Sequence, residues 1–274
     1  MHPILFHINV FGHSLSVHSY GVLLMLAFLA SVGWVYRTAL ANEGREDAID
    51  PNDVLDASVW MILAGVIGAR ALFIAIDWKD YSGNPASWFQ IWQGGISFHG
   101  ALIGGLIAMI VYCRMHKIPI LRFGDICAAP VMLGYAIGRI GCFFNGCCYG
   151  AQTNVAWAVN FNDEGHMTGP SHPTQIYSTI ISTLFFAALV RMYPRRKFDG
   201  QVFCWYMIFA GVERFVMEIW RASVTSTVVV LGLTDVQLLC LTLIIGGSIS
   251  LALLRRRAKL SYARDQQVLG VVQS

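Results

Sequence analysis

One apolar stretch around residue 214 carries charged side chains at helical spacing. Arg214, Glu218 and Arg221 are separated by four and then three residues, so they share one helix face, whereas Glu213 points elsewhere and is expected only to partner a basic residue. A charge near the centre of a bilayer costs at least ~2.5 kcal/mol, which pairing with Glu218 reduces. Two interpretations stay open: an ion pair that only makes burial tolerable, or a cationic face that binds an anion. The two arginines outnumber the single glutamate on this face, which favours the anion-binding interpretation.

The segment GRIGCFFNGCCYG, residues 138–150, places another Arg among glycines. Arg139 and Cys142 are three residues apart and share a helix face, with Gly146 one further turn on. Glycine permits close backbone approach and left-handed turns. A guanidinium binds two oxygens at once and therefore suits a phosphate. The alternative is an Arg that extends toward the outer lipid headgroups.

Two histidines stand where apolar stretches begin. His99 lies in GGISFHGALIGG, and His172 opens HPTQIY. An imidazole titrates near neutral pH and accepts a proton, which suits a catalytic role. A hydrogen-bonded core residue is the other interpretation of His99. The neighbouring Gly100 and Gly104 also form a small-residue pair of the kind that packs helices together.

Membrane-spanning helices must position these residues. Only 13% of the 274 residues are charged and 56% are hydrophobic, whereas a soluble domain is about 25% charged. A spanning helix takes about 20 mostly apolar residues, and seven stretches qualify. Their apolar runs are continuous, which favours helices over a closed β-barrel. We expect an all-α polytopic protein, one integral membrane domain over residues 1–274, with spans at 20–38, 54–76, 96–113, 126–144, 174–192, 202–220 and 236–254.

The basic residues orient these spans. Cytoplasmic loops are enriched in Lys and Arg. The side that holds the C-terminus carries Arg37, Arg45, Arg114, Lys117, Arg122, Arg191, Arg195, Arg196, Lys197, Arg255, Arg256, Arg257, Lys259 and Arg264. The opposite side carries only Lys79, with Arg221 near its border. The distribution predicts an outer N-terminus, a cytoplasmic C-terminus and an outer loop region at 146–172.

This topology brings the outward ends of the third to sixth spans to one depth. Those ends carry His99, Arg139, His172 and the Arg214 face. We therefore expect an anion-accepting cavity that opens toward the outer half of the membrane. The net charge of +3 is too small to predict nucleic-acid binding.

Three of the seven cysteines form a cluster at Cys142, Cys147 and Cys148. No fourth zinc ligand accompanies them in the sequence, so we expect no metal. A disulfide from Cys142 to Cys147 or Cys148 stays open on an oxidising outer side, as does plain packing. The other four cysteines lie in apolar runs and are expected to behave as small hydrophobic residues.

At these residues the sequence resembles the prolipoprotein diacylglyceryl transferases, a family of bacterial inner-membrane enzymes. The resemblance runs through SYGVLLMLAF (19–28), DASVWMILAGVIGARALFI (56–74), GGISFHGALIGG (94–105), GRIGCFFNGCCYG (138–150), HPTQIYS (172–178) and the Arg214 face. The family transfers the sn-1,2-diacylglyceryl group from phosphatidylglycerol to the lipobox cysteine of a prolipoprotein and releases glycerol phosphate. The resemblance implies this activity, both substrates, a multi-pass location in the inner membrane, and no metal or organic cofactor.

The resemblance also implies site residues. We expect His99 to assist thiol deprotonation or to orient the headgroup, and Arg139 and Arg214 to hold the phosphate. The residues expected to bind substrate are Tyr20, Arg139, Cys142, Gly150, Glu218, Arg221 and His172. Asp125 and Arg70 fall in matching stretches without a defined role.

Two positions depart from the family pattern. Cys142 stands where the family usually has Asn, and Ala210 stands where it often has Tyr. Both changes remove a hydrogen-bonding group near the expected site. They motivate a second interpretation, a divergent paralogue that uses another thiol acceptor or another lipid. A third interpretation is a non-catalytic lipid-binding protein or a transporter, although no inverted repeat is visible.

Overall fold

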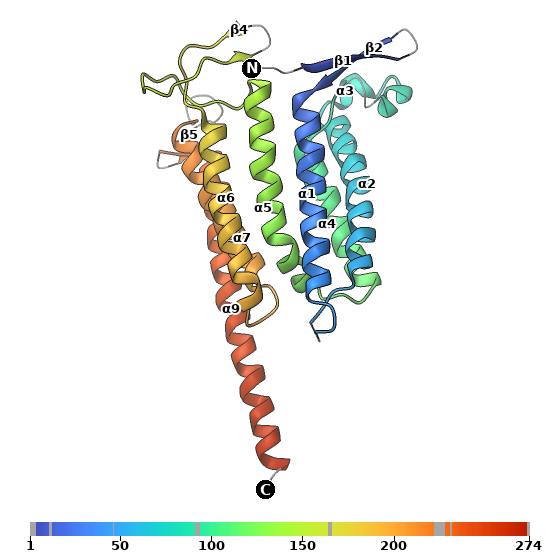
Figure 1. Ribbon diagram of the computed structural model, residues 1–274, viewed down its shortest axis with the longest axis vertical. Coiled ribbons are helices and arrows are strands. Elements are labelled where there is room, and N and C mark those ends of the chain that lie inside the picture. The colour runs from blue at the N-terminus through green and yellow to red at the C-terminus, as the bar shows by residue number, and fades with distance from the viewer. Residues whose placement is uncertain are drawn as a thin grey trace. The chain divides into compact units, whose positions relative to one another are not determined.

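The computed structural model describes residues 4–10, 13–45, 47–90, 94–163, 166–221, 228–230 and 232–272. Long helices dominate it (Figure 1). The elements in chain order are β1 (Ile4–Val10), β2 (His13–His18), α1 (Ser19–Ala41), α2 (Pro51–Ile76), α3 (Trp78–Tyr81), η1 (Pro85–Phe89), α4 (Phe98–Met115), α5 (Ile120–Asn145), β3 (Asn162–Asp163), β4 (His166–Met167), α6 (Thr174–Met192), η3 (Tyr193–Arg195), α7 (Gln201–Ile219), β5 (Val228–Val230), β6 (Leu233–Thr234) and α9 (Asp235–Val272). The strands form three separate antiparallel hairpins, β1–β2, β3–β4 and β5–β6.

A helix covers each of the seven predicted spans. Among the described residues, five segments are long and apolar enough to cross a membrane: α1, α2, α5, α6 with η3, and α9 as far as Arg264. The apolar part of α4, His99–Met115, is shorter. Every 18-residue stretch of α7 includes Glu213, Arg214 and Glu218. The helical class is confirmed, and the count of seven spans stays a prediction.

The chain forms two compact units, which are described separately. Unit 1 combines Met1–Trp34 with Gly124–Ser274, and unit 2 is Val35–Phe123. In unit 2, α2 packs against α4 through residues without large side chains. A Cβ atom at Gly100 would overlap the Gly68 carbonyl, and one at Gly104 would overlap the Ala64 carbonyl. The predicted packing role of the glycine pair is therefore confirmed.

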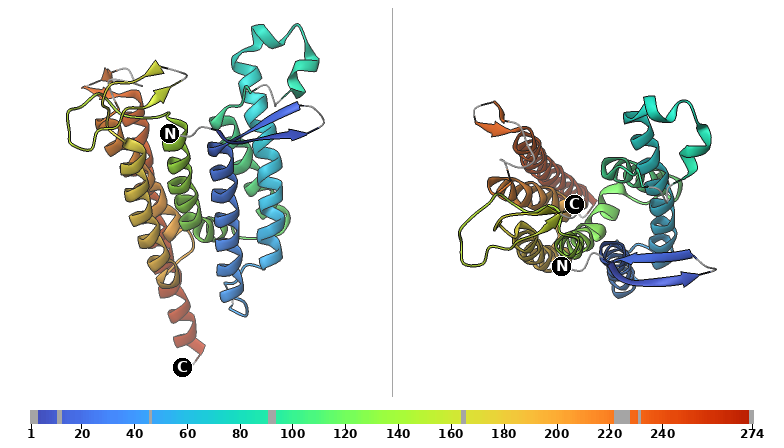
Figure 2. Two further views of the ribbon diagram at one scale, coloured as in Figure 1. Left: turned by 45° about the horizontal axis from the view of Figure 1, so that its top comes forward. Right: turned by 90° about the horizontal axis from the view of Figure 1, so that it is seen from above.

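In unit 1, α6, α7 and α9 run side by side (Figures 1 and 2). A Cβ atom at Gly211 of α7 would lie 3.0 Å from the Cys240 carbonyl oxygen of α9. A Cβ atom at Gly247 of α9 would lie 3.1 Å from the Cys204 carbonyl oxygen of α7. Small residues on both helices thus bring α7 and α9 close together, as is usual between membrane helices.

The start of α7 is fixed by a carboxylate from α5. Asp125 is 1% exposed and accepts hydrogen bonds from the backbone N–H groups of Gly200 and Phe203, both at 2.8 Å. Gly200 has a φ of 91°, which glycine adopts without strain. Asp125 therefore acts as an N-terminal cap supplied by another helix, and it sets the height of α7 beside α5.

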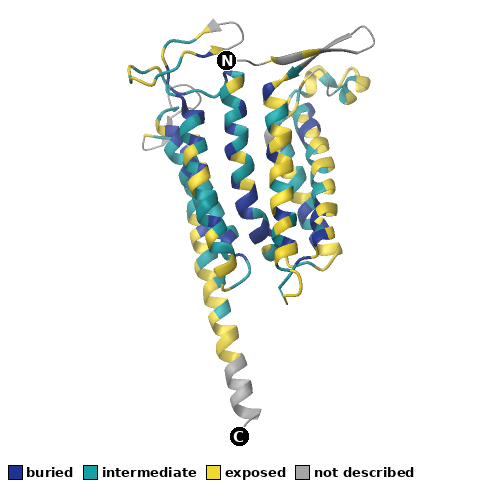
Figure 3. Ribbon diagram, viewed as in Figure 1, coloured by how far each residue is buried: buried dark blue, intermediate teal, exposed yellow. Residues whose placement is uncertain are grey.

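Apolar side chains are exposed along the outer faces of the helices (yellow in Figure 3). Leu29 of α1, Ile67 of α2 and Ile245 of α9 are examples. A soluble monomer rarely exposes large apolar patches, whereas a lipid-facing surface requires them.

Candidate active site

The predicted ion pair on α7 is present. Arg214 Nη1 lies 2.7 Å from Glu218 Oε2, one turn along the helix. The Glu218 side chain is fully buried, and the Arg214 side chain is 29% exposed. Arg214 Nη1 nevertheless has no hydrogen bond of good geometry within the described residues. Glu218 therefore compensates the charge of Arg214 and leaves part of its guanidinium accessible.

Arg139 lies in the last third of α5 and is only 8% exposed. Its Nε atom is buried and has no hydrogen-bond partner among the described residues. Leaving a buried donor unsatisfied costs about 1–3 kcal/mol, and more for a charged group. Such a donor is expected where a ligand completes the site, and a phosphate oxygen matches it in charge and geometry.

A polar network that the sequence did not reveal lies beside Arg139. Ser178 of α6 donates a short hydrogen bond to Glu213 of α7, and its oxygen lies 3.5 Å from the Tyr135 hydroxyl of α5. Glu213 is 2% exposed and interacts electrostatically with Arg139 and Arg214. Glu213 thus has the partner role that the sequence predicted. Tyr135 precedes Arg139 by one helical turn, and that spacing is the sequence signal for it.

The arginines of this region outnumber its glutamates by one positive charge. The cations are Arg139, Arg214 and Arg221, and the anions are Glu213 and Glu218. Low-dielectric surroundings strengthen electrostatic attraction. The region can therefore hold a singly charged anion such as a phosphodiester.

Gly150 joins the end of α5 to the start of α6 and the end of α7. Its N–H donates to the His172 carbonyl at 2.9 Å, and the next N–H, of Ala151, donates to the Trp220 carbonyl at 2.7 Å. A Cβ atom at Gly150 would lie 2.7 Å from Thr174 Cγ2 and 2.8 Å from the Trp220 oxygen. No side chain fits there, which explains why this position is glycine.

His172 belongs to an aromatic cluster next to this junction. Its Nδ1 lies 3.2 Å from the Tyr177 hydroxyl, which also accepts a hydrogen bond from Trp157 Nε1 at 2.6 Å. The Tyr177 and Trp220 rings meet edge to face at 5.4 Å. These contacts fix the orientation of the imidazole.

Tyr20 lies in the first turn of α1 and packs against α5. A Cβ atom at Gly141 would lie 3.2 Å from Tyr20 Cδ2. The Tyr20 side chain interacts electrostatically with Arg139, and the residue is 39% exposed. Unit 1 therefore brings Tyr20, Arg139, Gly150, His172 and the α7 face together around one end of α5.

Cys142, Cys147 and Cys148 meet at this same end of α5. Their sulfur atoms all lie within 4.8 Å of one another. None of the seven cysteines, all of which lie in the described part of the chain, forms a disulfide. Hydrogen bonds from the Cys142 and Cys147 thiols, aided by the charges of Arg221 and Arg139, lower the pKa of the Cys148 thiol below its ordinary value.

His99, the remaining predicted catalytic residue, belongs to unit 2. It is the second residue of α4, and its side chain is exposed. Ser97 caps the helix by accepting a hydrogen bond from the Gly100 N–H at 3.4 Å. The cap presents the imidazole at the helix start, as the sequence predicted.

The guanidinium of Arg70, in unit 2, is held by hydrogen bonds to backbone carbonyl oxygens. It donates to the carbonyls of Trp88 at 2.9 Å, Gly94 at 2.9 Å, Gly95 at 2.7 Å and Ser87 at 2.6 Å. Its role is therefore to hold the segment that follows α3.

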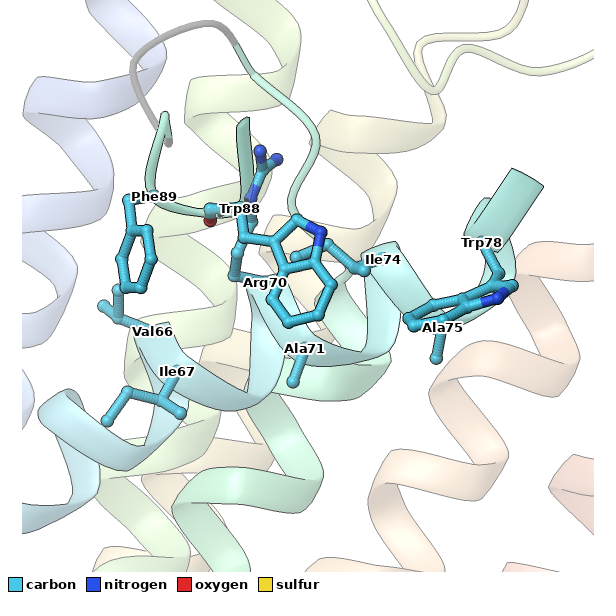
Figure 4. Close-up of a pocket in the computed structure, with 9 residues that line it drawn as sticks. All are labelled: Val66, Ile67, Arg70, Ala71, Ile74, Ala75, Trp78, Trp88 and Phe89. Atoms are coloured by element: carbon cyan, nitrogen blue, oxygen red, sulfur yellow. Dashed lines mark hydrogen bonds between the residues drawn. The ribbon is translucent and has the colours of Figure 1, made fainter. Parts of the chain in front are cut away.

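A mostly apolar cavity of about 500 Å³ adjoins Arg70. Its walls come from α2 and from the segment that carries Trp78, Trp88 and Phe89 (Figure 4). The Arg70 side chain rises from α2 toward that segment. By anchoring the segment, Arg70 forms one wall of the cavity.

Comparison with known proteins identifies the family of this chain. A family model described as prolipoprotein diacylglyceryl transferase matches residues 3–253. A phosphatidylglycerol–prolipoprotein diacylglyceryl transferase from Finegoldia magna is 33% identical over 242 residues, covering 88% of this chain and 92% of its own length. Proteins of the same name from Clostridium tetani (32% over 250 residues, covering 90% and 95%) and a Synechocystis species (30% over 261 residues, covering 90% and 87%) are also similar. The chain belongs to the prolipoprotein diacylglyceryl transferase family.

Proposed function

We propose that this protein transfers the sn-1,2-diacylglyceryl group of phosphatidylglycerol to the lipobox cysteine of prolipoproteins. The products are a thioether-linked prolipoprotein and glycerol phosphate. Family membership and the names of the three relatives support this activity. The unpartnered Nε of Arg139, buried beside a cationic helix face, is the structural observation that carries it.

We place the protein in the bacterial inner membrane as one integral membrane domain. Its apolar helices make it a multi-pass membrane protein. The basic residues favour an outer N-terminus, a cytoplasmic C-terminus and seven spans that include α4 and α7. The loop region at 146–172 then lies on the outer side, although residues 164–165 fall outside the described residues.

Arg139 and Arg214 suit the leaving group. Arg139 offers its buried Nε, and Arg214 offers the part of its guanidinium that Glu218 leaves accessible. As the thiolate forms a bond to the glyceryl CH₂ carbon, the C–O bond to the phosphate breaks and its electron pair stays on the phosphate oxygen. Cations fixed at that oxygen stabilise the developing charge.

The acceptor thiol must lose its proton before it attacks. A free thiol has a pKa of about 8.5, so a nearby base increases the reactive fraction at neutral pH. We assign this task to His99 on the family resemblance, with orientation of the headgroup as its alternative role. If transfer by His99→Gln were as fast as by the unsubstituted protein, both roles would be excluded.

The decisive experiment uses the full chain in detergent with phosphatidylglycerol and a synthetic lipobox peptide. We expect the peptide to gain the mass of one diacylglyceryl group while glycerol phosphate is released. A peptide with Ser in place of the lipobox Cys should gain nothing. No gain from correctly folded protein would contradict the proposal and favour another thiol acceptor or another lipid.

The alternative of a non-catalytic lipid-binding protein or transporter is not favoured. The relatives that cover most of this chain are all named as transferases. The Cys142 and Ala210 departures leave Arg139 and Arg214 in place, and Ala210 packs against the apolar cluster around Met132 and Leu189.

A further inference from the structure

Three thiols are gathered where α5 ends. The Cys142, Cys147 and Cys148 sulfurs lie within 4.8 Å of one another and are all half-buried. Each sulfur therefore has two further soft ligand atoms within reach of a single ion.

The backbone explains why two of these side chains meet. The Cys147 N–H donates to the Cys142 carbonyl at 3.2 Å, and the Gly146 N–H donates to the Phe143 carbonyl at 3.2 Å. Gly146 has a φ of 81°. These features define a Schellman helix end, in which the side chains at the positions of Cys142 and Cys147 come into contact.

The third thiol is brought in by an uncommon backbone conformation. Cys148 has a φ of 65°, in the left-handed region that side-chain-bearing residues rarely adopt. Two fully buried side chains of α6 hold it there. Gln175 Nε2 donates to the Cys147 carbonyl at 2.7 Å, and Thr174 Oγ1 donates to the Cys148 carbonyl at 2.9 Å.

We propose that Cys142, Cys147 and Cys148 form a three-thiolate site for a soft metal ion such as Zn²⁺ or Cu⁺. Three sulfurs on a tetrahedral Zn²⁺, each about 2.3 Å from the ion, are about 3.8 Å apart, which small side-chain rotations achieve from the present spacing. Thiolates are the ligands that soft ions select.

The surroundings fit this chemistry. Arg139 and Arg221 interact electrostatically with the Cys148 sulfur and favour negative charge there. The α6 hydrogen bonds orient the ligand-bearing backbone, as residues around metal sites commonly do. The sequence expectation of no metal rested on a missing fourth protein ligand, and a three-ligand zinc site leaves that position for water or another ligand. The proposed ion needs no transferase activity to bind, although its site shares Cys142, Arg139 and Arg221 with the residues expected to bind substrate.

The test is a metal titration of the reduced, metal-free, full-length protein in detergent. Cd²⁺ bound to thiolates gives a sulfur-to-metal charge-transfer absorption in the ultraviolet. We expect this band to saturate at one ion per chain and to disappear when Zn²⁺ competes. Cys142→Ser and Cys147→Ser should each weaken binding by at least about 100-fold, because losing a ligand exceeds losing an orienting partner.

Cys127→Ser is the matched control, since Cys127 lies on α5 with similar exposure but outside the cluster. It should bind Cd²⁺ as the unsubstituted protein does. Thr174→Val, which keeps all three thiols, should weaken binding by about 10- to 100-fold. This variant keeps the proposal testable if a cysteine variant does not fold.

Two results would overturn the metal site. One is the absence of the charge-transfer band in folded, fully reduced protein. The other is a Cys142–Cys147 or Cys142–Cys148 disulfide, seen as the loss of two hydrogens by mass, in protein prepared without reductant but with Zn²⁺ present.

Discussion

Arg70 and Arg139 are both buried arginines, but their surroundings differ in kind. Arg70 is 7% exposed and donates to four backbone carbonyls. Arg139 is 8% exposed and keeps an Nε without a hydrogen-bond partner among the described residues. Burial alone therefore does not identify a functional arginine. The hydrogen bonds of its N–H groups do identify one. A guanidinium whose N–H groups all bind protein oxygens stabilises the fold, whereas a buried N–H group without a protein partner is able to bind a ligand.

The largest effect is expected from Arg139→Ala. Removing a cation that stabilises developing charge should lower the transfer rate by about 100- to 1,000-fold. The midpoint of thermal unfolding should fall less than in Arg70→Ala, because no hydrogen bond from its Nε to the protein is lost and only its attraction to Glu213 is removed. Rates with the lipobox peptide and thermal unfolding of the same preparation check this. Full activity in Arg139→Ala would remove the distinction between the two arginines.

Arg70→Ala should show the opposite behaviour. It leaves four carbonyls without their charged donor, and we expect a loss of about 2–4 kcal/mol in the free energy of unfolding. The segment that carries Trp88 should loosen and become accessible to protease. Thermal unfolding and limited proteolysis measure both effects. An unchanged unfolding midpoint would mean that these hydrogen bonds do not hold the segment.

Glu218→Gln refines the comparison at Arg214. The change removes the charge that orients the guanidinium but keeps the size of the side chain. We expect a loss of about 2 kcal/mol in transition-state binding, or roughly 30-fold in kcat/KM. A purely structural ion pair would instead lower the unfolding midpoint and leave kcat/KM of the folded enzyme unchanged.

Gly150→Ala tests the junction that holds the site. The added methyl group would lie 2.7 Å from Thr174 Cγ2, so overpacking should cost about 1–3 kcal/mol in stability. Gly138→Ala is the control, because nothing lies within 4 Å of a Cβ there and the position is helical. That variant should be more stable by up to about 1 kcal/mol. Equal unfolding midpoints for the two variants would contradict the tight junction.

The smallest effect is expected from Tyr177→Phe. It removes the hydroxyl that contacts both His172 and Trp157, at a cost of about 1 kcal/mol. If His172 contributes to substrate binding, the KM for phosphatidylglycerol should rise a few-fold while kcat stays constant. A change in kcat with constant KM would contradict that role.

Much of the fold was predictable because helical spans depend on local composition. The fifth predicted span, 174–192, coincides with α6, and the sixth, 202–220, is displaced by one residue from α7. The last span continues to Val272, far beyond the predicted residue 254, because hydropathy marks the apolar part of a helix and not its charged continuation. The strands were not predicted. Those of β3–β4 and β5–β6, with two or three residues each, are too short to leave a periodic pattern, whereas β1 and β2, with seven and six residues, were missed despite their length.

The candidate site was predictable where one helix supplies all its parts. The Arg214–Glu218 pair follows from a spacing of four residues, and the proximity of Arg139 to Cys142 follows from a spacing of three. Contacts between helices were not predictable in the same way. Tyr135, Ser178 and Glu213 come from α5, α6 and α7, and no sequence spacing relates them.

The sequence by itself determined that this protein is a membrane transferase of a known family, and which helix faces carry charge. These properties depend on composition, periodicity and motifs, all of which are local. Only the tertiary structure decided which buried arginine is already satisfied: Arg70 donates to the carbonyls of residues 87, 88, 94 and 95, whereas Arg139 keeps an Nε without a partner among the described residues. The physical reason is that a hydrogen bond depends on distance and direction between atoms that the fold alone brings together.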